Sequence, residues 1–312
     1  MNSKVDKRII GQVREEKVLT LLARFGVLNQ QILTAWIVPN KRTGARMIQR
    51  TLRRLLDRQE IVVHWTRDPM PVYGIARKGC RRLHSLDPVR WRNLRSSADF
   101  VRQSCMAYGH ARHRLLGAGL IHSLYREFAQ LQTKLSPEWD HLQVGFASEQ
   151  DIVHRHEVTP LAKAGRSAYG RRSDGIFGIG HSESMEGYWI EIERSGKRTK
   201  QFEDMIQTFK MIAESATLAD NVEVAGLIIA SDRERFLRRV RNRLESEEHP
   251  VNDMTIYRLG GFLEWKRWPE DGKTLADVGE YGWAAQNNLR VAEELGLNED
   301  GCYDEEEDDD TP

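Results

Sequence analysis

The sequence is poor in cysteine and has no long apolar run, and both absences narrow the classes of protein that it fits. Its three cysteines, Cys80, Cys105 and Cys302, lie far apart among 312 residues, so we expect free thiols rather than a disulfide framework or a cysteine metal site. No apolar stretch approaches the roughly 20 residues that a membrane span needs. Residues 1–8 also lack the apolar core of a signal peptide. These absences predict a globular, cytoplasmic protein without a membrane span.

The net charge of +1 hides an uneven distribution of charge. Residues 1–130 hold 25 Lys and Arg but only 9 Asp and Glu, whereas residues 304–310 are seven consecutive acids. A basic segment of this kind is typical of proteins that bind phosphates, so we expect DNA as a partner. Repulsion among like charges predicts a disordered acidic tail over residues 299–312. The tail either aids solubility or folds back onto the basic front of the chain.

Residues 1–97 have the pattern of a small DNA-binding domain. The expected elements are helices over residues 13–25, 29–36 and 43–59 and strands over 61–65 and 72–75. Asn29 is a plausible N-cap of the second helix. Three helices followed by a hairpin predict an N-terminal winged helix-turn-helix. Residues 80–97 are expected to form a basic connector, with Trp91 packed on one of the domains.

The third helix is the one that lies in the major groove in such a domain. Arg46, Gln49 and Arg50 are the candidates for contacts with bases. The residues expected to contact the DNA backbone are Lys41, Arg42, Arg53 and Arg54, with Arg171 and Arg172 from the second domain. Two alternatives are an Arg-rich helix that is merely solvated and a winged helix that contacts another protein.

Residues 98–298 are expected to form an α/β domain. The expected helices cover residues 100–130, 199–215 and 232–244, and the expected strands cover 142–146, 173–177, 188–193, 222–230 and 254–259. This order predicts a mixed sheet flanked by helices.

Acidic residues at the edges of two of these strands suggest a metal site. Asp174 begins one apolar strand, and Glu191 and Glu193 alternate along the next, so those two share a face. If the strands pair as a hairpin, Asp174 and Glu191 can converge on a cation such as Mg²⁺, which can assist cleavage of a phosphodiester. Acids that alternate on a strand are otherwise simply its solvated face. His113, at the end of an apolar helical stripe, is either a satisfied core residue or part of the same site.

Short motifs in a fixed order strengthen the metal hypothesis. They are His113-Arg114-Leu115-Leu116, Ala147-Ser148-Glu149, Ser173-Asp174-Gly175 and Glu191-Ile192-Glu193. Over residues 10–245 this order resembles the replication-relaxation proteins of mobile elements, including the MOBC-type relaxases of mobilisable plasmids. The second domain of that family is similar to PD-(D/E)xK nucleases. The resemblance implies a restriction-endonuclease-like fold that holds Mg²⁺ or Mn²⁺ through Glu149, Asp174 and Glu191, with Glu193 and His113 close by.

The chain departs from the nuclease signature at Glu193, which stands where the signature has lysine. Lys197 or Lys200 can supply the missing charge, Glu193 can itself act as a ligand or a base, or the site is inactive. The resemblance implies a metal-dependent endonuclease or nickase at the origin of a plasmid or mobile element. Its partners would be a double-stranded site, a nicked or single-stranded product and accessory mobilisation proteins. The alternative is a non-catalytic DNA-binding regulator of replication or transcription on a nuclease-like scaffold.

Overall fold

The fold is that of a computed structural model of the chain. It describes residues 7–38, 42–66, 70–99, 101–102, 108–132, 143–154, 160–165, 172–180, 185–193, 199–215, 217–219, 221–245, 254–259 and 265–267. Over these ranges, no helix combines the length and the apolar content that crossing a bilayer requires.

The N-terminal part of the chain consists of helices and a small antiparallel sheet. Its elements are α1 (Lys7–Phe25), β1 (Leu28–Asn29), α2 (Gln30–Ile37), α3 (Gly44–Asp57), β2 (Ile61–Trp65), β3 (Pro71–Ile75) and α4 (Arg77–Leu86). The strand order is β1-β3-β2, with both pairs antiparallel. The side chain of Asn29 accepts a hydrogen bond from the backbone N–H of Ile32 at 2.9 Å, which confirms its predicted role as a cap. Ile48, Leu52 and Leu55 of α3 are buried, so the predicted apolar stripe faces the core.

Residues 80–86 of the segment predicted as a basic connector belong to the helix α4, which packs on α1 and β2. The apolar stripe of α4 is short: only Gly79, Cys80 and Leu83 are buried. Because five of its ten residues are Arg, Lys or His, the sequence of α4 does not show a clear apolar periodicity. A Cβ on Gly79 would lie 2.3 Å from the backbone oxygen of Glu60, so α4 packs too closely for any larger residue there. Trp91 is buried, as predicted.

The C-terminal part is a mixed sheet flanked by helices, which confirms the coarse prediction. Its elements are α6 (Tyr108–Gln132), β4 (Gln143–Ser148), α7 (Glu149–His154), α8 (Pro160–Ala164), β5 (Gly175–Gly180), β6 (Met185–Glu193), α9 (Thr199–Ala213), β7 (Thr217–Ala219), β8 (Val222–Ser231), α10 (Glu234–Glu245), β9 (Met254–Leu259) and β10 (Trp265–Arg267). The strand order is β10-β9-β8-β6-β5-β4, with β7 beside β8. The strands β4, β5 and β6 pair antiparallel, whereas β6, β8 and β9 run parallel.

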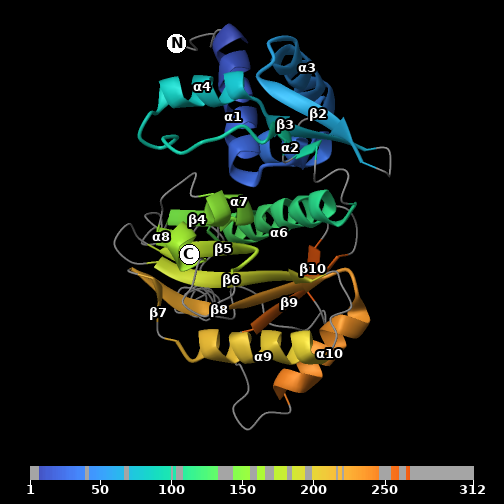
Figure 1. Ribbon diagram of the computed structural model, residues 1–312, viewed down its shortest axis with the longest axis vertical. Helices are drawn as coiled ribbons and strands as arrows, with labels where there is room; N and C mark the ends of the chain where they lie inside the picture. Colours follow the sequence, from blue (N-terminus) through green and yellow to red (C-terminus); the bar gives the residue numbers. More distant parts are fainter. Residues whose placement is uncertain are drawn as a thin grey trace, which may run out of the picture.

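The two faces of the sheet pack against different helices (Figure 1). Tyr188, Ile190 and Ile192 of β6 belong to the apolar cluster that includes α6. Trp189, between them, belongs to the cluster that includes α8, α9 and α10. Because side chains alternate along a strand, Glu191 and Glu193 lie on the same face as Trp189. A strand packed on both faces reads as nearly continuous apolar sequence, as β8 does.

The apolar core is continuous from the N-terminal part to the sheet, across the boundary predicted at residue 97. One cluster contains residues of α1, α2 and α3 together with residues of α6, β5 and β6. The ring of Phe25, at the end of α1, stacks on that of Phe146 in β4, with centroids 5.4 Å apart. Trp36 of α2 packs on His122 of α6, and the centroids of the two rings lie 5.2 Å apart. The helices above the sheet in Figure 1 are therefore held against it by buried aromatic contacts.

Candidate functional site

The helix α7 begins where the N-terminal part meets the sheet, and a capping box fixes its first turn. The N–H of Asp151 donates to Oγ of Ser148 at 3.1 Å, and the N–H of Ser148 donates to Oδ2 of Asp151 at 3.1 Å. Arg24, from the end of α1, donates through Nε to the same Oδ2 at 3.2 Å. Its guanidinium also lies 3.6 Å from the centre of the Phe146 ring. These contacts fix the position of Glu149, the first residue of α7.

Asp174 and His113 reach the same place from the sheet and from α6. Asp174 lies just before β5 and is held by backbone contacts on β6: its N–H donates to the oxygen of Ile190 at 3.0 Å. Its Oδ2 accepts from the N–H of Ile192 at 2.7 Å. Oδ1 lies 3.1 Å from Nε2 of His113, on the first turns of α6. The backbone of β6 thus orients the Asp174 carboxylate toward α6.

His113, Glu149 and Asp174 form a group of potential metal ligands. One ligand atom from each lies within 4.8 Å of the others, and all three side chains are partly exposed. They line a pocket together with the polar residues Arg114, Gln150 and Ser148. The rest of its lining consists of Phe25, Gly117, Ala118, Ile121 and Ile192. Three residues that are distant in the sequence therefore share one solvent-connected pocket.

The carboxylates of this pocket change the acidity of the basic groups beside them. Burial by itself would lower the pKa of His113, but the hydrogen bond and the charge of Asp174 raise it. The charges of Glu149 and Glu191 act in the same direction, and the net result is a raised pKa. Burial lowers the pKa of Arg114, although the charges of Glu149 and Asp174 oppose that effect. The carboxylates of the pocket therefore favour a positive charge beside them, whether it comes from a protonated His113, from Arg114 or from a bound cation.

Glu191 and Glu193, the other predicted acids, lie on β6 beside this group but outside it. Gly175 pairs with Ile190 in the hairpin, so Glu191 stands across from Asp174. Glu191 and Glu193 are buried and share the face of Trp189, which is directed toward α9. Their carboxylates are not among the ligand atoms gathered within 4.8 Å. The structure thus joins Glu149 and Asp174 with His113, and Glu191 acts on His113 through its charge.

Arg114 also lines the pocket, although no role was predicted for it from the sequence. Nη1 of Arg114 donates to Oε1 of Gln150 at 2.7 Å, and Nη2 lies 3.3 Å from Oε1 of Glu149. The signal that could have found this arrangement is the spacing Ser148-x-x-Asp151. This capping-box pattern places Glu149 and Gln150 in the first turn of a helix, where they can both be reached by one guanidinium.

The pocket offers two kinds of ligand atom to a cation. One imidazole nitrogen and two carboxylates offer mixed N and O ligands, whereas Mg²⁺ prefers oxygen alone in octahedral geometry. Because the neutral imidazole is the ligand, a cation bound here would displace a proton from His113. Protons and the cation therefore compete for the imidazole of His113. Because the pKa of His113 is raised, protons compete more strongly than they would for a free imidazole, above all at low pH.

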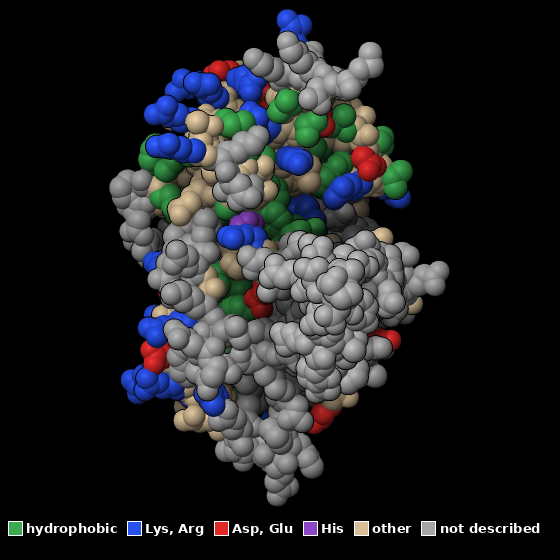
Figure 2. Space-filling model, turned by 180° about the vertical axis from the view of Figure 1, so that it is seen from behind, with side chains coloured by type: hydrophobic (Ala, Val, Ile, Leu, Met, Phe, Trp, Pro, Cys, Tyr) green, Lys and Arg blue, Asp and Glu red, His purple; other side chains and the backbone are tan. Residues whose placement is uncertain are grey.

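A second candidate surface is the outer face of α3. Arg42, Arg46, Gln49, Arg50 and Arg53 are exposed, and within the described ranges none of these arginines forms an ion pair. In Figure 2, Lys and Arg side chains gather at the upper left of the rear face, the side on which α3 lies. Most of the predicted DNA-contacting residues of this helix therefore share one accessible basic face.

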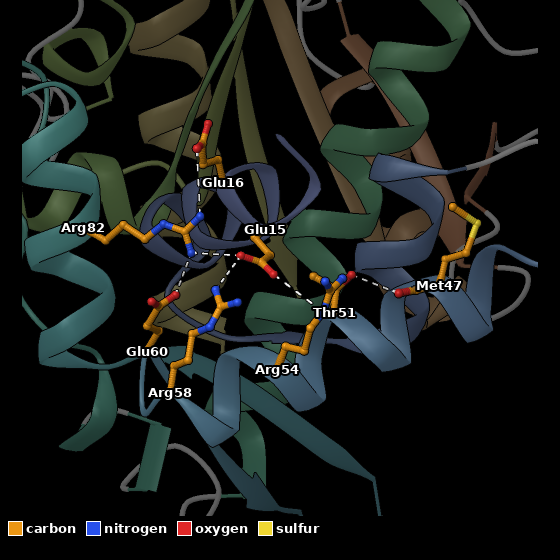
Figure 3. Close-up of polar contacts among 8 residues, drawn as sticks. All are labelled: Glu15, Glu16, Met47, Thr51, Arg54, Arg58, Glu60 and Arg82. Carbon is orange, nitrogen blue, oxygen red and sulfur yellow. Dashed lines mark hydrogen bonds and ion pairs between the residues drawn. The ribbon is translucent and has the colours of Figure 1, made fainter. Parts of the chain in front are cut away.

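Arg54 differs from its neighbours because it is tied to a buried acid, Glu15 of α1. Figure 3 shows Glu15 among three arginines: Arg54 of α3 at 3.6 Å, Arg58 at the C-cap of α3 at 2.8 Å and Arg82 of α4 at 3.1 Å. Arg82 also pairs with Glu60 at 2.9 Å. This network connects α1 to α3 and α4. Arg54 therefore helps to orient α3, and about half of its side chain is still exposed to solvent.

Three other predicted site residues, Lys41, Arg171 and Lys197, lie outside the described residues. Arg172 is exposed at the residue before Ser173, two positions ahead of Asp174.

Comparison of the chain with models of protein families, with curated proteins and with solved structures found no match.

Proposed function

We propose that this protein is a metal-dependent DNA endonuclease or nickase of the relaxase kind. In this proposal α1, α2, α3 and the β2–β3 hairpin are a winged helix-turn-helix, and the C-terminal part is a PD-(D/E)xK-like nuclease domain. The observation that carries the proposal is the pocket in which His113, Glu149 and Asp174 converge from α6, α7 and the start of β5. A mixed sheet with acids at the ends of its central strands, flanked by helices on both faces, is consistent with that fold.

His113, Glu149 and Asp174 would hold the cation, Mg²⁺ or Mn²⁺. Bound there, the ion would polarise a phosphate and lower the pKa of a coordinated water. Glu191, across the hairpin from Asp174, adds negative charge without joining the ligand group. Because Glu193 occupies the position of the signature lysine, a positive charge for the phosphate has to come from another residue.

The protein residues around the pocket keep its ligands in place. The N–H of Ile192 holds one oxygen of Asp174, which leaves the other directed toward His113. Arg114 pairs with Glu149 at 3.3 Å and so restrains the second carboxylate. Preorganised ligands of this kind spare a site the cost of ordering them when the substrate arrives.

The exposed basic face of α3 supports DNA as the substrate. Arg46, Gln49 and Arg50 would read base edges in the major groove, while Arg42 and Arg53 would contact phosphates. Lys41 and Arg171, which lie outside the described ranges, would also contact DNA phosphates. Arg172 would contact the DNA backbone near the pocket. The aromatic contacts between α1, α2 and the sheet hold this reading face at a fixed position relative to the pocket.

The biological setting belongs to the same proposal. The resemblance to replication-relaxation proteins favours action at the origin of a plasmid or mobile element, in the cytoplasm, alongside accessory mobilisation proteins.

A nicking assay on supercoiled plasmid tests the proposed activity directly. We expect relaxation of the plasmid in Mn²⁺, none in EDTA, and loss of activity in Asp174→Asn. The matched control is Asp204→Asn, a similar change on α9, outside the pocket, which should retain full activity. Equal nicking by Asp174→Asn and the wild type would remove this pocket from the mechanism.

A second candidate function is a non-catalytic DNA-binding regulator. It is favoured by Arg114 and by His113, whose pKa is raised, because these two groups can neutralise Glu149 and Asp174 without a metal. Calorimetric titration with Mn²⁺ separates the two functions. Heat of binding that disappears in His113→Gln supports the enzyme, whereas DNA binding without any heat from Mn²⁺ supports the regulator.

A further inference from the structure

The end of the β2–β3 hairpin carries an exposed tryptophan, which is unusual for so large an apolar side chain. Trp65 is 63% exposed, whereas the other tryptophans of the described ranges, Trp36, Trp91, Trp189 and Trp265, are buried or partly buried. Of the tryptophans in the described ranges, Trp65 is therefore the one whose ring is available to stack on a ligand.

The strand β2 directs this side chain outward from the end of an apolar row. Every second residue of a strand points to the same face, so one face of β2 carries Ile61, Val63 and Trp65. Their exposure rises along the strand: Ile61 is buried, Val63 is partly buried and Trp65 is exposed. Trp65 pairs with Pro71 at the last position of the ladder, and the N–H of Thr66 donates to the oxygen of Met70 at 3.1 Å. The backbone under the indole is therefore held by the hairpin, so the ring is presented from a fixed strand end.

Charge around the hairpin indicates which ligand would cover the ring. The strand β2 follows α3 directly and packs against it, and the exposed face of α3 carries Arg46, Arg50 and Arg53. A polyanion held by these arginines therefore lies on the helix that packs against the strand of Trp65. A protein partner would instead have to bring an apolar surface together with strong negative charge.

We propose that Trp65 is a stacking site for an unpaired DNA base. The inference rests on the proposed DNA-binding function of α3 and adds the form of DNA that is bound. An indole stacks on the face of a nucleobase, and in a regular duplex both faces of each base are already covered by neighbouring base pairs. Trp65 therefore binds DNA in which a base has left the stack, as at a gap or a bulge.

Binding measurements without divalent metal test this site separately from any cleavage. The probes are a fully paired duplex and the same duplex with a short single-stranded gap, each titrated into the full chain in EDTA. We expect the gapped probe to bind more tightly and to quench tryptophan fluorescence. Trp65→Ala should weaken binding of the gapped probe roughly 5- to 100-fold, leave the paired probe unchanged and abolish the quenching. Trp65→Phe should keep most of the preference.

The matched control is Val89→Ala, which trims an exposed apolar side chain outside the hairpin. It should bind both probes as the wild type does. Equal affinity of Trp65→Ala and the wild type for the gapped probe would overturn the inference, as would an equal loss on both probes. A change of oligomeric state in Trp65→Ala without a change in probe preference would assign the indole to a contact between copies instead. Gap preference in a protein that never nicks would retain this inference and reject the proposed enzyme.

Discussion

Arg24 offers the sharpest test of how the N-terminal helices are joined to the sheet. Its guanidinium is 13% exposed and pairs at 3.2 Å with Asp151, which is 1% exposed. It also donates to the backbone oxygen of Phe146 and lies over the ring of that residue. Arg24→Met keeps the aliphatic stem but removes all three polar contacts, so the Asp151 carboxylate loses the cation that faces it from α1.

The magnitude follows from the burial of this pair. Removing one partner of a buried ion pair costs about 3–5 kcal/mol, because the other charge stays buried without its counterion. The hydrogen bonds that Asp151 receives within the capping box persist, which favours the lower end of that range. With an entropy of unfolding of about 2.1 cal/mol/K per residue, each kcal/mol shifts the Tm of a 312-residue chain by about 1.5–2 °C. We therefore expect Arg24→Met to lower Tm by roughly 5–6 °C.

Differential scanning calorimetry on a double-mutant cycle measures this coupling. The cycle comprises Arg24→Met, Asp151→Asn and the double variant, and we expect a coupling energy of about 2 kcal/mol or more between the two sites. Arg53→Met, on the exposed face of α3, is the matched control and should change stability by less than about 0.5 kcal/mol. A Tm of Arg24→Met equal to that of the control would refute the inference that this contact holds the two parts together.

Three further predictions concern buried charge and burial. Glu15→Gln should lower the free energy of unfolding by about 1–3 kcal/mol in urea denaturation, since its arginine partners remain partly solvated; unchanged stability would contradict the role of the network. Burial raises the pKa of Cys80 to about 11, so in a variant with Cys105→Ser and Cys302→Ser the thiol should resist a disulfide reagent near pH 8 until urea is added. Because the pKa of His113 is raised above 6.5, its protonated form stabilises the metal-free fold fully below about pH 6.5 and loses that effect as pH rises through the folded-state pKa. The stability difference between wild type and His113→Gln should therefore shrink with rising pH, and a difference that grows would contradict the assignment.

Local patterns in the sequence were enough to predict most of the elements. The apolar stripe of α3, the cap at Asn29 and the continuous apolar run of β8 each depend on residues close together in the chain. The helix α4 escaped prediction because its few buried positions lie among basic residues. The capping box at Ser148 and Asp151 was readable in principle, since its spacing of three residues is a local signal.

The sequence by itself determined that acids would stand at the ends of two strands and that a basic helix would precede a hairpin, while the pairing of the two acidic strands is a property of the structure. Only the tertiary structure decided which side chains meet. The backbone of β6 orients Asp174 toward His113 on α6, and the cap of α7 sets Glu149 beside them. Strand alternation directs Glu191 to the face of β6 opposite to that of Ile192, which lines the pocket. Periodicity fixes which face a residue occupies, whereas the distance between two carboxylates depends on how separate elements pack, and no local pattern encodes that.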